Sequence, residues 1–211
     1  MILDQVRLTD DVSGSDLQTF LQRAKRLGCE HVRLSAGEST LVATVAVLTK
    51  QSLLDADPTV LGVRTYGLVE PHNIDTTVQV EAVLDRLARD TTEFALPVGQ
   101  AGVPWAGIAI PRGGWDAVGA ITEDALERVA RAGIDAVANA NGLGVRIVDQ
   151  VRRDTWGASI PASTDGYTIP AGAAFAAFGL GFLSGGDSVA TVTRSGVWTR
   201  VSTARGFIVT R

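Results

Sequence analysis

Residues 166–186 contain no charged side chain, although 20% of the whole chain is charged. The centre of this run, residues 169–183, reads IPAGAAFAAFGLGFL. Such a segment folds as the buried heart of a domain, as a membrane-touching element or as an interface between subunits. A transmembrane helix needs ~20 mainly apolar residues. The apolar run has only 15 residues and lacks a basic flank. We therefore exclude a transmembrane helix.

The order of large and small residues predicts that residues 169–183 form a helix. Pro170 suits a first helical turn, where its missing N–H costs nothing. The phenylalanines recur every three or four residues and share one face, and small residues line the opposite face. We expect a core helix, with a dimer interface through 169–183 as the alternative. Each Gly within a helix costs about 1 kcal/mol, so Gly179 and Gly181 are expected to end the helix early.

Length and composition predict one globular domain over residues 1–211, with a sub-boundary near 115–122. The chain is 45% hydrophobic and carries a net charge of −4. Its single cysteine, Cys29, excludes an intramolecular disulfide, and the first residues lack the basic and apolar regions of a secretory signal. We therefore expect a cytoplasmic protein. The excess of Arg over Lys indicates a bacterium with a GC-rich genome.

The hydrophobic pattern predicts an α+β fold, in which helices pack on a mainly antiparallel sheet. Ser15 is expected to cap a first helix that starts at Asp16 and ends near Gly28. Further helices are expected around residues 80–87, after Thr122 and over 145–156. Strands are expected at 2–8, 31–34, 40–48 and 60–69, and residues 187–211 at the end of the chain read as a three-strand meander.

No residue set completes a known catalytic or metal-binding pattern. Cys29 and His31 would lie on the same face of a strand, but no further Cys or His at metal-ligand spacing supports a zinc site. The only other histidine, His72, lies in a Pro-Asn turn without a partner nucleophile in a recognised motif. We expect no metal, no cofactor and no catalytic residues.

Residues 97–115 form a long segment rich in Pro and Gly, which predicts a loop. One alternative function uses this loop as the lid of an enzyme that acts on a small anionic substrate. Trp105 and Trp115 would then line the pocket, and Arg112 or His72 would contact the substrate.

The C-terminal meander is basic, because four arginines and no acidic residue follow Asp187. Trp198 and Arg200 alternate onto one face of a strand. A surface of this kind can stack a base or bind an acidic peptide, so RNA or acidic-peptide binding is the second alternative. The acidic charge of the rest of the chain disfavours RNA.

The helix order from Thr122 to Ser202 is also compatible with a winged helix. The third helix would have to enter the DNA major groove, and it is the uncharged one. We therefore expect no DNA binding. The leading hypothesis is a non-catalytic protein that binds another protein or a small ligand, with self-association through 169–183.

Overall fold

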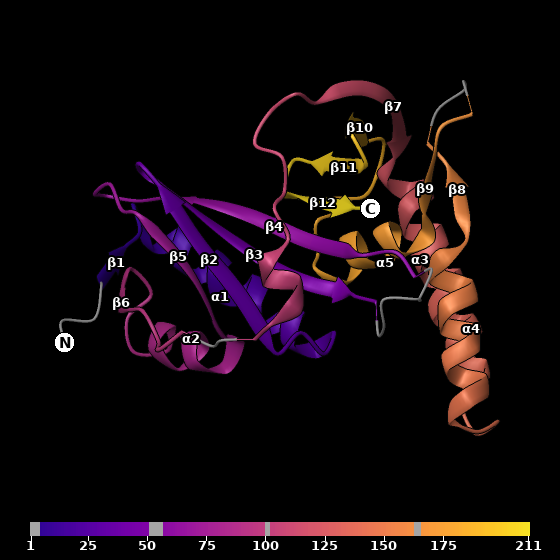
Figure 1. Ribbon diagram of the computed structural model, residues 1–211, viewed down its shortest axis with the longest axis horizontal. Coiled ribbons are helices and arrows are strands. Elements are labelled where there is room, and N and C mark those ends of the chain that lie inside the picture. The colour runs from indigo at the N-terminus through magenta and orange to yellow at the C-terminus, as the bar shows by residue number, and fades with distance from the viewer. Residues whose placement is uncertain (1–4, 51–56, 100–101, 163–165) are drawn as a thin grey trace. The chain divides into compact units, whose positions relative to one another are not determined.

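The computed structural model describes residues 5–50, 57–99, 102–162 and 166–211, which divide into two compact units (Figure 1). The first unit consists of residues up to Val47 together with Val63–Ile108. The second consists of Leu48–Gly62 together with Ala109–Arg211. Both combine helices with antiparallel strands, and the C-terminal strands form a meander, which confirms the predicted α+β class.

The first unit contains six strands, two α-helices and a short 3-10 helix. In chain order they are β1 (Gln5–Arg7), α1 (Asp11–Arg26), β2 (His31–Gly37), β3 (Thr40–Leu48), β4 (Val60–Gly67), β5 (Ile74–Gln79), α2 (Val80–Leu87), β6 (Glu93–Ala95) and η1 (Pro104–Gly107). The main sheet has the order β5-β2-β3-β4, and β1 pairs with β6 in a separate ribbon.

One face of this sheet is fully buried. Val32 of β2 lies opposite Val45 of β3 and Val78 of β5, and none of the three is exposed to solvent. Helix α1 packs against α2 and buries Leu17 and Phe20. The alternation of buried and half-exposed residues along β2 therefore follows the period of two that the sequence shows.

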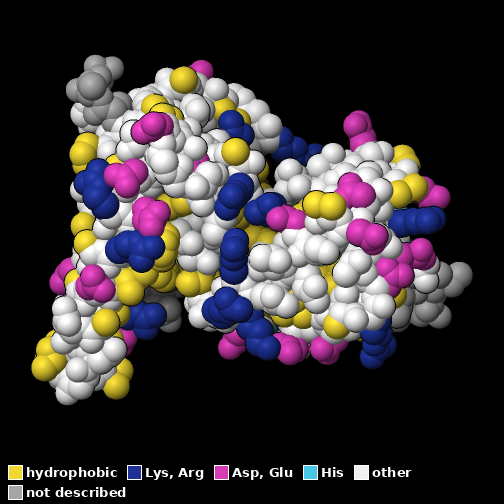
Figure 2. Space-filling model, turned by 180° about the vertical axis from the view of Figure 1, so that it is seen from behind, with side chains coloured by type: hydrophobic (Ala, Val, Ile, Leu, Met, Phe, Trp, Pro, Cys, Tyr) yellow, Lys and Arg dark blue, Asp and Glu magenta, His cyan; other side chains and the backbone are white. Residues whose placement is uncertain are grey.

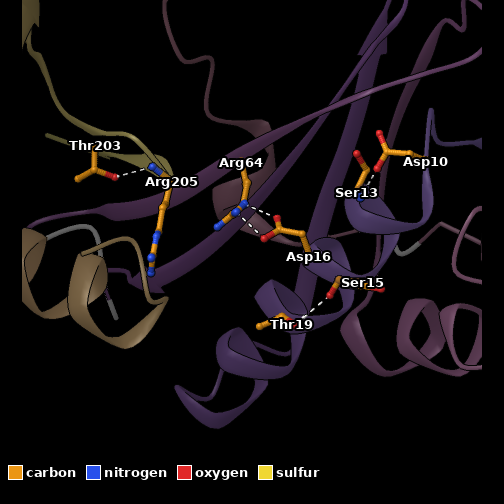
Figure 3. Close-up of polar contacts among 8 residues, drawn as sticks. All are labelled: Asp10, Ser13, Ser15, Asp16, Thr19, Arg64, Thr203 and Arg205. Atoms are coloured by element: carbon orange, nitrogen blue, oxygen red, sulfur yellow. Dashed lines mark hydrogen bonds and ion pairs between the residues drawn. The ribbon is translucent and has the colours of Figure 1, made fainter. Parts of the chain in front are cut away.

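Helix α1 begins earlier than the sequence predicted. Asp10, rather than Ser15, is the N-cap, and its carboxylate accepts a hydrogen bond of 2.7 Å from the backbone N–H of Ser13 (Figure 3). This bond lowers the pKa of Asp10. Ser15 lies within the helix, where its carbonyl accepts a bond from the Thr19 hydroxyl. With Asp10 as its cap, the helix is longer at its N-terminal end than predicted.

An ion pair joins α1 to β4 within the first unit. Arg64 approaches both carboxylate oxygens of Asp16, as Figure 3 shows. Tyr66 is buried nearby, and burial together with the charge of Asp16 raises the pKa of its hydroxyl. The polar face of α1 is thereby fixed to the sheet by a charged contact in addition to its apolar packing.

The second unit contains six strands and three helices. They are β7 (Asp116–Thr122), α3 (Glu123–Asn139), α4 (Val145–Gly157), β8 (Ser159–Pro161), β9 (Thr168–Pro170), α5 (Ala171–Gly179), β10 (Val189–Ser195), β11 (Trp198–Thr203) and β12 (Gly206–Thr210). The sheet has the order β12-β11-β10-β7, and the first residues of β4, which belong to this unit, lie next to β12. Strands β8 and β9 form a separate ribbon.

Helix α5 is the predicted core helix, but it is shorter than residues 169–183. It begins after Pro170 and ends at Gly179, and Gly181 then adopts a left-handed φ of 72°. The glycines end the helix early, as expected, because the chain can reverse there without a Cβ clash. Within the second unit α5 packs against α3, α4 and β12. Most of its residues are buried, so the core position that the sequence favoured is the one observed.

Aromatic rings fix α5 to its neighbours. The ring of Phe175 stacks on Trp156 of α4 at 4.3 Å, and the guanidinium of Arg131 from α3 lies 4.8 Å from the ring of Phe178. A Cβ on Gly133 of α3 would lie only 2.3 Å from the ring of Trp156. The crossing of α3 and α4 therefore requires glycine at this position.

Replacing Gly133 by Ala should lower the stability of the second unit. The added methyl group overlaps the Trp156 ring, and such overpacking costs roughly 1–3 kcal/mol, which exceeds the gain of about 1 kcal/mol in helix propensity. Thermal melting followed by circular dichroism measures the change. Gly157→Ala is the matched control, because nothing lies within 4 Å of a Cβ there. A Gly133→Ala protein that melts at or above the wild-type temperature would contradict this packing.

Candidate functional site

One face of the C-terminal meander gathers arginines and aromatic rings. The guanidinium carbon of Arg200 on β11 lies 4.6 Å from the centre of the Trp115 ring and 5.7 Å from that of Phe207. The guanidinium of Arg211 lies 5.0 Å from the ring of Trp198. We call these five residues the arginine–aromatic surface, of which Trp198 is buried. All three contacts have the geometry of cation–π interactions.

The register of the strands explains why these residues meet. Arg200 lies opposite Thr193 of β10 and opposite Val209 of β12, and Ser202 lies opposite Phe207. Directly opposed residues project to the same face of an antiparallel sheet, and so do residues two apart on one strand. Trp198, two residues before Arg200, therefore shares its face.

Trp115 reaches this face through the segment Pro111–Trp115, which precedes β7. Its indole N–H donates a hydrogen bond of 3.2 Å to the carbonyl of Pro111. The hydroxyl of Ser195 on β10 donates one of 3.3 Å to the carbonyl of Gly113. Gly114 has a φ of 70°, a conformation that L-residues rarely adopt, and it allows the chain to turn so that the indole can contact Arg200.

No acidic side chain neutralises this surface. Among the residues that the structure describes, neither the Arg200 nor the Arg211 guanidinium makes an ion pair or a hydrogen bond. The Nε atom of Arg200 is buried, as is the hydroxyl of Thr193 opposite it, and both lack a hydrogen-bond partner. Buried polar groups are nearly always hydrogen-bonded, so this pair is unusual within the fold.

The six residues that the sequence singled out are distributed over both units. Trp115, Trp198 and Arg200 lie on the arginine–aromatic surface, and the exposed Arg112 belongs to the segment that carries Trp115. Trp105 lies in η1 of the first unit. His72 lies between β4 and β5 of the first unit, where its backbone N–H bonds to the carbonyl of Glu38.

Sequence reasoning missed Phe207, Arg211 and Thr193. Phe207 belongs to the third strand of the meander, Arg211 follows directly after that strand, and Thr193 belongs to the first. The alternation along each strand gives their faces, but the register between strands is needed to show which of them are neighbours.

The first part of the Pro/Gly-rich segment 97–115 is packed on the first unit. Arg33 of β2 binds Asp75 of β5 through two hydrogen bonds of 2.7 and 2.8 Å, and its third bond, of 3.3 Å, reaches the carbonyl of Ile108. A Cβ on Gly99 would come within 2.7 Å of the Thr76 hydroxyl. Residues 100–101 of this segment lie outside the described residues.

A second notable surface is the end of the α3–α4 hairpin, where large apolar side chains are exposed. Leu143, Val145 and Ile147 are 59%, 77% and 49% exposed. Figure 2 shows hydrophobic side chains on this hairpin, which projects at the lower left. Over the face drawn there, acidic and basic side chains are interspersed. No helix in the described ranges is both long and apolar enough to cross a membrane.

The fold is similar to that of bacterial DNA polymerase sliding clamps. Similar structures are a protein described as a DNA polymerase III beta subunit from Eubacterium rectale (TM-score 0.55, 11% identity), the beta sliding clamp of Caulobacter crescentus (0.55, 11%) and the sliding clamp of Pseudomonas aeruginosa (0.51, 13%). The matches cover 99%, 98% and 99% of this chain. The chain spans 65%, 64% and 64% of the length of those proteins.

The family is shown by sequence models. Residues 1–107 match the model described as a domain of unknown function, DUF8010, and the chain belongs to that family. Residues 110–211 match the model of a second domain of unknown function, DUF8185. No curated protein is similar to the chain in sequence. The prediction that DNA is not a partner has no support from these comparisons, because the similar folds belong to DNA polymerase subunits.

Cys29 is a buried thiol whose pKa is raised. Its thiol is buried and donates a hydrogen bond of 3.2 Å to the carbonyl of Ala46. Burial raises its pKa to about 12. In the described part of the chain, no three His, Cys, Asp or Glu side chains are grouped so that they could hold a metal ion.

We expect Cys29 to be unreactive in the folded protein. A pKa of about 12 leaves only about one thiol in ten thousand ionised at pH 8, and the thiolate is the reactive form. Ellman's reagent at pH 8 should release almost no colour from native protein and one equivalent in urea, where the ordinary pKa returns. Rapid reaction of the native protein would show that the thiol is accessible.

Proposed function

We propose that the protein is a non-catalytic binding protein that recognises an acidic segment of a partner protein on its arginine–aromatic surface. The observation that carries this proposal is the Arg200 guanidinium, which lies over the rings of Trp115 and Phe207 and has no carboxylate partner among the described residues. We retain the sequence-based prediction that the protein is bacterial and cytoplasmic.

The chemistry of arginine favours a carboxylate as the ligand. Aromatic rings beside a guanidinium contact its flat faces, and the N–H groups at its edge remain able to donate hydrogen bonds. That edge matches a carboxylate through two parallel hydrogen bonds, which are stronger than bonds between neutral groups. Stacking also orders the side chain before binding, so less conformational entropy is lost when the ligand arrives.

Arg211 gives the surface a second positive group. It follows directly after β12 and, by the register of β11 with β12, lies opposite Trp198 on the same face as Arg200. Two ordered arginines on neighbouring strands can bind two acidic side chains of one extended peptide. Side chains two residues apart on a strand share a face, so alternate acidic residues suit this arrangement.

The charge of the whole chain favours a peptide over a nucleic acid. Nucleic-acid binding depends mainly on phosphate contacts and uses wide basic surfaces, whereas this chain has a net charge of −4. The similarity to beta subunits of a DNA polymerase supports a role within a multi-protein assembly. Because of the same similarity, duplex DNA is a necessary competitor in the test.

The alternative of an enzyme with residues 97–115 as its lid is less well supported. The bond from Arg33 to Ile108 and the close packing of Gly99 hold the first part of this segment on the first unit. Only the short segment Pro111–Trp115 then remains available for movement over the C-terminal sheet.

The test is a titration of a dye-labelled peptide in which Glu alternates with Ala, followed by fluorescence anisotropy. The wild-type protein should bind it, and Arg200→Ala should weaken binding about 10- to 100-fold, because a hydrogen bond to a charged group contributes about 1.5–3 kcal/mol. Arg205→Ala is the charge-matched control. Arg205 lies in the β11–β12 turn and its side chain extends away from Thr203, to which its backbone bonds (Figure 3).

Three outcomes would contradict the proposal. The first is a wild-type protein that does not bind the peptide. The second is an equal loss in Arg205→Ala and Arg200→Ala, which would indicate attraction by overall charge alone. The third is tighter binding of a duplex DNA of 20 base pairs at the same salt concentration.

A further inference from the structure

The two buried polar atoms on the arginine–aromatic surface belong to directly opposed residues. Thr193 of β10 and Arg200 of β11 are cross-strand partners. Side chains in such positions have Cβ atoms about 4.5–5.5 Å apart. The Thr193 hydroxyl and the Arg200 Nε therefore project from the same place on the sheet, and neither has a hydrogen-bond partner.

We propose that Thr193 and the Nε edge of Arg200 form a subsite for one carboxylate, and that the segment Pro111–Trp115 covers it until the ligand binds. This inference rests on the proposed binding of an acidic peptide. It adds a specific pair of donors and a movable cover. One carboxylate oxygen would accept the hydroxyl proton of Thr193 in a hydrogen bond, and the other would accept the Nε–H of Arg200.

Burial distinguishes this subsite from the rest of the surface. Thr193 is 8% exposed, and its hydroxyl oxygen is inaccessible to solvent. A hydroxyl buried without a partner destabilises a protein relative to a methyl group of the same shape. Packing alone would therefore favour Val over Thr at this position. A ligand that accepts a hydrogen bond from the hydroxyl would explain why threonine occupies this position.

The other unpartnered buried atoms in the described ranges provide a comparison. The Tyr66 hydroxyl belongs to the first unit. Thr210 of β12 is 3% exposed and also has an unpartnered hydroxyl, but it lies opposite Thr199 and thus projects from the other face of the sheet. Among the described residues, Thr193 and Arg200 are the only directly opposed pair in which both side chains carry a buried donor without a hydrogen-bond partner.

The cover continues directly into β7, whose first residue, Asp116, pairs with Arg194 of β10, and two further contacts join it to the sheet. The hydrogen bond from Ser195 to Gly113 and the stacking of Trp115 on Arg200 join the segment to β10 and β11. The bond from the Trp115 indole to Pro111 lies within the segment and can move with it. Arg112, Gly113 and Gly114 are exposed. A small displacement of this segment would uncover both donors, and Arg112 would add positive charge beside the bound carboxylate.

The experiment compares Thr193→Val with Thr210→Val in the peptide titration described above. Both substitutions replace a buried, unpartnered hydroxyl by a methyl group, so both proteins should melt at or slightly above the wild-type temperature. Thr193→Val should weaken peptide binding about 5- to 10-fold through loss of one hydrogen bond. Thr210→Val should bind the peptide as tightly as the wild type does.

Two further variants test the Nε edge and the cover. Arg200→Lys keeps the charge but loses the forked donor, and should weaken binding about 10-fold. Ser195→Ala removes the bond that holds the segment closed, and should tighten binding about 2- to 3-fold. Unchanged or weaker binding by Ser195→Ala would overturn the covering role of the segment.

The outcomes separate this inference from the function on which it rests. Wild-type affinity in Thr193→Val, together with a large loss in Arg200→Ala, would overturn the subsite and leave the peptide-binding function intact. A wild-type protein that does not bind the peptide would overturn the function itself. An equal loss in Thr193→Val and Thr210→Val would assign the effect to the sheet as a whole and would also overturn the subsite.

Discussion

The second unit depends on how closely its helices can approach one another. Helix α5 consists entirely of Ala, Gly and Phe, and it is enclosed because α3, α4 and β12 all pack on it. Small residues allow this approach, and at the α3–α4 crossing Gly133 leaves the space that the Trp156 ring occupies. Since interiors are close-packed, one added methyl group affects several elements at once. The rigid layer beneath the meander holds its strands in a fixed register.

That register determines the chemistry of the opposite face. Val201 and Ile208 are opposed and fully buried, so Arg200 and Phe207 must project to the other side. The arginine–aromatic surface is thus a consequence of core packing combined with strand alternation. It is also where the fold leaves charge unneutralised, since no acidic residue follows Asp187. Among the described residues, Arg200 and Arg211 on this face contact aromatic rings and no carboxylate, which is the basis of the proposed binding of an acidic partner.

The sequence predicted those elements whose signals are local. The caps and periodicity of α3, the run of strand residues in β3 and the turns of the meander were all evident, and the structure contains them. Five strands were not predicted, namely β5, β6, β7, β8 and β9, and of these β5 and β7 belong to the main sheets. Residues 74–79 (IDTTVQ) and 116–122 (DAVGAIT) have weak alternation and many small or polar residues. They are strands because an established neighbour, β2 or β10, offers them a hydrogen-bonding edge.

The α+β class, the enclosed apolar helix and the basic character of the last strands follow from the sequence alone, because composition and periodicity are properties of short stretches of the chain. Only the tertiary structure brought Trp115 to Arg200 and placed Thr193 opposite that arginine. The sequence places Trp115 in the pocket of the enzyme alternative and Arg200 on the face that would bind RNA or an acidic peptide. Their contact depends on strand register and on the turn at Gly114, which are set by packing between residues far apart in the chain.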